Sequence, residues 1–91
     1  MHARLIAKLK RETGISWVKD GSEWNGGSEV LWSGEGATIP NGEGEAVNAF
    51  DYYGPESIYE FGVHKTLVAW AEKNGVYWEC HDPGTYHAYK V

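Results

Sequence analysis

The chain has 91 residues and a formal net charge of −5, and 14% of its residues are aromatic. A chain of this length predicts a single domain. Five tryptophans and six tyrosines exclude the aromatic-poor composition that is typical of disordered proteins. The single cysteine excludes an intramolecular disulfide, which favours a reducing cytoplasm. No apolar run approaches the roughly 18 residues of a membrane span, so we expect a cytoplasmic protein that does not contact a membrane.

The first half of the chain predicts one helix and several short strands. Residues 3–13 place Leu5, Ile6 and Leu9 on one helical face, and Gly14 follows at a position where glycine often ends a helix. A glycine-rich loop is expected after the second strand. Apolar and β-branched residues predict three strands, over residues 15–19, 29–33 and 47–53.

The second half of the chain predicts a helix and a C-terminal hairpin. Val63, Leu67 and Trp70 form an apolar helical stripe, and a capping box beginning at Ser57 predicts that the helix starts there. Two further strands are expected over residues 76–80 and 85–91. The sequence Asp-Pro-Gly-Thr at 82–85 predicts a type II turn between them.

This order of elements predicts an α+β fold. We expect a small single domain over residues 1–91, with a mostly antiparallel sheet of four to five strands and two helices packed on one face. Four tryptophans on strand and helix faces are expected to lie in the core: Trp17, Trp32, Trp70 and Trp78.

One short segment has the residue types of a metal or thiol site. Cys80, His81, Asp82 and His87 can all bind a metal, and a histidine beside a cysteine can activate the thiol. In an extended strand Cys80 and His81 point to opposite faces, and no second cysteine pair or HExxH motif is present. A small metal-dependent or thiol-dependent enzyme is therefore an alternative function. The leading interpretation is a non-enzymatic protein without a cofactor.

Exposed aromatic residues beside carboxylates suggest a second alternative. Aromatic rings stack on sugars, and Trp24, Tyr52 and Tyr53 lie in turn-like, acidic segments. A carbohydrate-binding module would use these rings. Trp24 is also a good anchor for a protein partner, because tryptophan is enriched among the residues that dominate binding energy.

Charge is distributed very unevenly along the chain. Residues 1–19 carry five lysines and arginines against one glutamate, whereas residues 20–64 carry nine carboxylates and no lysine or arginine. The remaining residues, 65–91, are neutral overall. Such an acidic segment repels nucleic acid and attracts basic surfaces, including the grooves with which proteins neutralise phosphate.

The charge distribution predicts a protein-binding inhibitor. Its acidic loops would block the basic surface of a nucleic-acid-handling protein without binding nucleic acid directly. An unpaired edge strand would also permit a homodimer. The residues expected to bind the partner are Asp20, Glu23, Trp24, Glu29, Glu35, Glu43 and Glu45.

In its overall profile the chain resembles small phage and mobile-element proteins of the anti-CRISPR and anti-restriction kind. Those proteins are short, often acidic single domains that lack catalytic signatures and bind a defence protein. The resemblance rests on the profile of the whole chain and on no single motif, so it transfers no functional residue. It implies a phage-encoded inhibitor acting in the host cytoplasm, with a CRISPR effector or a restriction component as its partner.

Overall fold

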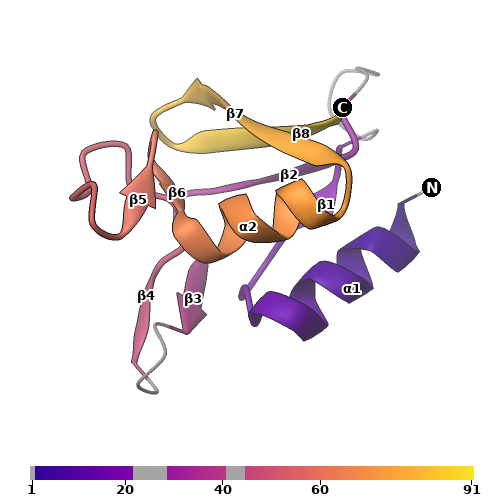
Figure 1. Ribbon diagram of the computed structural model, residues 1–91, viewed down its shortest axis with the longest axis horizontal. Helices are drawn as coiled ribbons and strands as arrows, with labels where there is room; N and C mark the ends of the chain where they lie inside the picture. The colour runs from indigo at the N-terminus through magenta and orange to yellow at the C-terminus, as the bar shows by residue number, and fades with distance from the viewer. Residues whose placement is uncertain (1, 22–28, 41–44) are drawn as a thin grey trace.

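The computed structural model describes residues 2–21, 29–40 and 45–91 (Figure 1). Two α-helices and eight short strands lie in this part of the chain. In order they are α1 (Ala3–Thr13), β1 (Lys19–Asp20), β2 (Leu31–Gly34), β3 (Thr38–Pro40), β4 (Ala46–Asn48), β5 (Tyr59–Glu60), β6 (Val63–His64), α2 (Lys65–Lys73), β7 (Val76–Asp82) and β8 (Thr85–Lys90).

The main sheet has four antiparallel strands in the order β1-β2-β8-β7. Two small hairpins, β3–β4 and β5–β6, stand outside this sheet. Both helices lie on the same side of the sheet, as Figure 1 shows. The predicted α+β class, the mostly antiparallel sheet and the placement of the helices are therefore confirmed.

The core lies between the sheet and the helices. Its fully buried side chains include Leu9 from α1, Leu67 from α2, and Leu31 and Tyr86 from the two central strands. Among the tryptophans, Trp70 is buried, whereas Trp17, Trp32 and Trp78 are only partly buried. The amphipathic stripes of the two helices thus supply one wall of the core, and alternate residues of the strands supply the other.

The second helix begins later than its sequence predicts. It starts at Lys65 and not near Ser57, because Phe61 and Gly62 adopt positive φ angles of 51° and 82° and reverse the chain before it. His64 then caps the helix, since its Nδ1 accepts a hydrogen bond of 3.1 Å from the Thr66 N–H.

Three other local predictions are also corrected. The strand expected over residues 47–53 ends at Asn48, and only Lys19 of the strand expected over 15–19 joins the sheet. The type II turn is wrong, because Gly84 is not among the glycines with positive φ. Instead, Asp82 Oδ1 accepts the Gly84 N–H at 2.9 Å, and this side-chain bond closes the turn.

Neither α1 nor α2, the helices of the described residues, is long and apolar enough to cross a membrane.

Candidate functional site

Four of the seven residues predicted to bind a partner lie in the described part of the chain, and they come from separate segments of the fold. Glu23, Trp24 and Glu43 lie outside the described residues. The other four are dispersed over different parts of the fold: Asp20 in β1, Glu29 just before β2, Glu35 just after β2, and Glu45 beside β4. Glu29 and Glu35 are six positions apart in extended chain, a span of about 20 Å, so these two carboxylates lie at opposite ends of β2.

Two of these carboxylates already have partners within the protein. Asp20 Oδ2 accepts the His2 N–H at 2.9 Å, which ties the start of α1 to β1. The side chain of Glu29 is only 12% exposed, and its Oε1 lies 3.2 Å from Nδ1 of the buried His87. Glu35 and Glu45, by contrast, are exposed.

Exposed aromatic rings and four carboxylates, of which Asp51 is half-buried and the other three are exposed, gather instead at the end of the molecule that carries the β5–β6 hairpin. We call this surface the end face. It consists of Glu35, Asp51, Tyr52, Tyr53, Glu56, Glu60 and Phe61. Two shallow hollows share Tyr52: one also contains Glu35, Asp51 and Tyr53, and the other contains Glu56, Glu60 and Phe61. The two hollows therefore adjoin at Tyr52.

The loop that carries the tyrosines is fixed by buried aromatic residues on both sides. Phe50 stacks on Tyr86 with ring centroids 4.6 Å apart, and the Tyr59 hydroxyl donates to the Asn48 carbonyl at 2.8 Å. Burial of its ring, with a smaller contribution from the charge of Asp51, raises the pKa of Tyr59. Because Phe50 and Tyr59 point inward, the loop between them presents its own side chains outward.

The tyrosines and Phe61 are the large aromatic side chains that this surface exposes. Tyr52 is 52% exposed, Tyr53 is 85% exposed and Phe61 is 92% exposed. The Tyr53 N–H is held by Asp51 Oδ1 at 3.2 Å, and the two tyrosine rings meet edge to face at 5.1 Å. Rings placed in this way offer contact area without a large loss of side-chain freedom on binding.

The β5–β6 hairpin reverses through a two-residue turn made by Phe61 and Gly62. Positive φ at both residues is the geometry of a type I′ turn, for which Asn-Gly is the usual sequence. A glycine is required at position 62, because a β-carbon there would overlap the Tyr86 hydroxyl. The fold does not require phenylalanine at position 61. A bulky residue in left-handed backbone is strained, and the Phe61 ring is not buried. Strain of this kind is often found at functional positions.

The end face is strongly acidic. Its four carboxylates belong to Glu35, Asp51, Glu56 and Glu60, and one lysine, Lys65, lines the same hollows. With a Debye length of about 8 Å at physiological salt, neighbouring carboxylates act together on an approaching charge. This surface is therefore suited to a cationic partner with some apolar contact.

The segment with metal-ligand residues is divided between the two faces of the sheet. Cys80 pairs with Tyr86 in the register of β7 and β8, and its exposed thiol donates to the Asp82 carbonyl at 3.1 Å. The rings of His81 and His87 stack at 4.9 Å on the opposite face. Within residues 2–21, 29–40 and 45–91, no three His, Cys, Asp or Glu side chains are grouped so that they could hold a metal ion.

Sequence reasoning did not indicate that Phe61, Glu56 and Glu60 lie together on the end face. The capping-box pattern that begins at Ser57 extends to Glu60 and indicates a helix, and Phe-Gly is not a recognised turn pair, so no sequence signal indicates the hairpin. Tyr52 and Tyr53 were identified as exposed aromatic residues, but for a sugar site. The charge pattern and the end face fall in the same stretch of chain, since every carboxylate of the end face lies within residues 20–64.

Comparisons with protein-family models, with curated proteins and with solved structures found no significant match to this chain.

Proposed function

We propose that the protein is a non-enzymatic binding protein that uses its end face to occupy a basic surface of a nucleic-acid-handling protein. One observation carries this proposal: exposed carboxylates and three exposed aromatic rings share one surface with a single lysine. By excluding nucleic acid from that surface, the protein would act as an inhibitor. The overall profile of the chain favours a defence protein, such as a CRISPR effector or a restriction component, as its partner.

Both components of this surface contribute to the proposed binding. Carboxylates accelerate the encounter with a basic groove and reject phosphate, so they provide partner selection. Aromatic side chains provide most of the binding energy when they are desolvated, and tyrosine is among the residues most enriched at such positions. Tyr53 and Phe61 project far enough from the surface to be buried by a partner.

The test is retention of partners from a nuclease-treated bacterial lysate by three immobilised proteins: wild type, Glu56→Lys and Glu45→Lys. The two variants change the net charge equally, and both positions are exposed. Glu56 belongs to the end face, whereas Glu45 flanks the separate β3–β4 hairpin (Figure 1). Washing at about 50 mM and about 500 mM salt separates electrostatic contacts from the rest.

The proposal expects a nucleic-acid-handling protein that is retained at low salt by wild type and by Glu45→Lys, and lost with Glu56→Lys. Equal retention by all three proteins would contradict a role for the end face. Loss of the partner with Glu45→Lys alone would indicate that the partner binds the acidic loops predicted from the sequence and not the end face.

The exposed tyrosine pair supports a second candidate, a sugar-binding module. Tyr52 and Tyr53 lie beside the carboxylates of Glu35 and Asp51, which can accept hydrogen bonds from sugar hydroxyls. A glycan array probed with wild type and with Tyr53→Ala would decide this point. A specific glycan that binds wild type and not the variant would favour this candidate over the first.

A further inference from the structure

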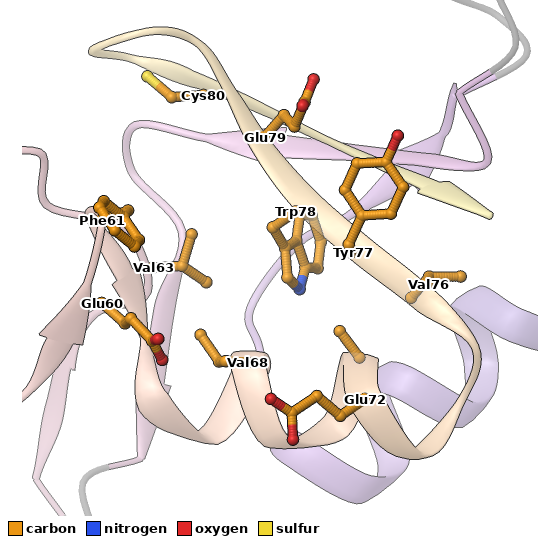
Figure 2. Close-up of a pocket in the computed structure, with 11 residues that line it drawn as sticks. Glu60, Phe61, Val63, Val68, Glu72, Val76, Tyr77, Trp78, Glu79 and Cys80 are labelled. Carbon is orange, nitrogen blue, oxygen red and sulfur yellow. The ribbon is translucent and has the colours of Figure 1, made fainter. Parts of the chain in front are cut away.

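A groove continues from the end face along the outer edge of the main sheet. It has a volume of about 520 Å³ and lies between β7, α2 and the β5–β6 hairpin, as Figure 2 shows. Five consecutive residues of β7, Val76–Cys80, line it. Since successive side chains of a strand point to opposite faces, five in a row can line a groove only along the strand's edge.

The edge of β7 has unpaired backbone groups that point toward this groove. In the described sheet β7 has one neighbour, β8. The Val91 N–H donates to the Gly75 carbonyl at 3.0 Å, so alternation along the antiparallel pair directs Tyr77 and Glu79 toward β8. The backbone N–H and C=O groups of the residues between them point away from β8: those of Val76, Trp78 and Cys80.

The groove has an apolar floor and an acidic rim. Val63, Val68 and Trp78 turn into the space between the strand and the helix, and Phe61 stands at one end of it (Figure 2). Trp78 is fixed there, because its Nε1 donates to the Leu67 carbonyl at 3.2 Å. The rim carries three glutamates, Glu60, Glu72 and Glu79, and none of the described residues that line the groove is a lysine or arginine.

We propose that this groove binds an extended, positively charged peptide segment, which pairs with β7 as an added strand. Backbone hydrogen bonds along the open edge would supply affinity, and alternate side chains would supply selectivity. Alternate residues of the peptide would be apolar and contact the floor of the groove. The residues between them would be basic and lie beside Glu79. The inference rests on the proposed function, since the segment would belong to the same basic partner.

Charge decides between this occupant and a second copy of the chain. Pairing two β7 strands edge to edge would bring two acidic rims together, in proteins that each carry a net charge of −5. Like charges opposite one another destabilise a strand pair, whereas a basic peptide places opposite charges there. The groove therefore disfavours the homodimer and favours the basic segment.

The test uses a synthetic seven-residue peptide of alternating lysine and valine, labelled with a fluorophore and titrated with the protein. Fluorescence anisotropy at about 50 mM salt gives the dissociation constant. The variants are Glu79→Lys, in the groove, and the charge-matched Glu45→Lys, outside it. We expect Glu79→Lys to weaken binding at least about tenfold more than Glu45→Lys does. Equal weakening by the two variants would overturn the groove as the site.

Two N-methylated versions of the peptide test the added strand itself. One is methylated on the valine amides and the other on the lysine amides. Because the N–H groups of one parity point toward β7, only one of these peptides should keep its affinity. Equal affinities of the two methylated peptides would overturn strand addition. Sedimentation of the wild-type protein as a dimer that Glu79→Lys strengthens, by relieving the repulsion between the rims, would overturn it as well, since a second copy would then occupy the edge.

These results are separable from those of the proposed function. Lysate partners whose retention depends on Glu56 but is unaffected by Glu79→Lys would support binding at the end face and contradict binding in the groove. A peptide that binds the groove with the expected selectivity supports the inference even when no lysate partner depends on Glu56.

Discussion

Replacing Phe61 by asparagine should make the protein more stable while it weakens partner binding. A non-glycine residue in left-handed backbone is strained by about 1–2 kcal/mol, and asparagine relieves much of that strain. The ring is 92% exposed, so burial of the remaining area, about 16 Å², contributes only about 0.4 kcal/mol. The net gain is therefore about 0.5 kcal/mol, which raises the melting temperature by about 2–4 °C in a domain of this size.

Thermal unfolding followed by far-ultraviolet circular dichroism measures this effect, with Phe61→Ala as the matched control. Alanine removes the ring but keeps a β-carbon in the strained backbone, so its melting temperature should not exceed that of wild type. If Phe61→Asn melts no higher than Phe61→Ala, strain at this position is not the dominant effect and the argument fails. Both variants should bind the lysine–valine peptide more weakly than wild type, because each removes the ring from the end of the groove.

Three further predictions concern titratable groups and the contact between the helices. Burial lowers the pKa of His64, so the unfolded chain takes up a proton near pH 6.5 while the folded protein does not. Stability should thus fall as the pH drops below about 6.5. The urea midpoint should fall less between pH 7 and pH 5 for His64→Asn than for wild type, and this variant keeps a hydrogen-bond acceptor for the Thr66 N–H. Burial raises the pKa of Tyr86, so the unfolded chain loses its proton first; wild type should lose more stability than Tyr86→Phe between about pH 9 and about pH 11 in the same assay. Glu12 Oε1 accepts the Trp70 indole N–H at 3.0 Å, so Glu12→Ala should lower the free energy of unfolding by about 1 kcal/mol and Glu12→Gln by much less; equal losses would contradict the hydrogen bond.

The helices and strands could be predicted where the spacing of apolar residues agreed with residues that typically end a helix or form a turn. The bounds of α1 follow from its apolar stripe and from Gly14, which adopts the left-handed conformation expected of a helix-ending glycine. The β7–β8 hairpin follows from two strand-like runs around a Pro-Gly turn. The predicted start of α2 was wrong because two local features favoured different structures. A capping box at Ser57 indicated a helix, whereas the buried Tyr59 and the turn at Phe61 required a hairpin.

The site could be predicted only in part, because it depends on long-range contacts. The absence of lysine and arginine from residues 20–64 predicted that the charge of the surface is negative. It could not tell that Glu29 lies against the buried His87, 58 positions away, or that Glu35 and Tyr52 line the same hollow of the end face. The β7 groove was hidden for a related reason: strand order, and hence which edge stays open, is set by pairings between distant segments.

The most direct test of the central claim is competition between this protein and DNA for a retained partner. Wild-type protein is immobilised, loaded from a nuclease-treated lysate at low salt, and then exposed to increasing concentrations of duplex DNA. If the end face occupies a nucleic-acid-binding groove, DNA releases the retained protein, and wild type and Glu45→Lys, which share an unchanged end face, release it over the same range of DNA concentration. Partners that remain bound at saturating DNA would contradict the account, since they would be held at a surface that nucleic acid does not share.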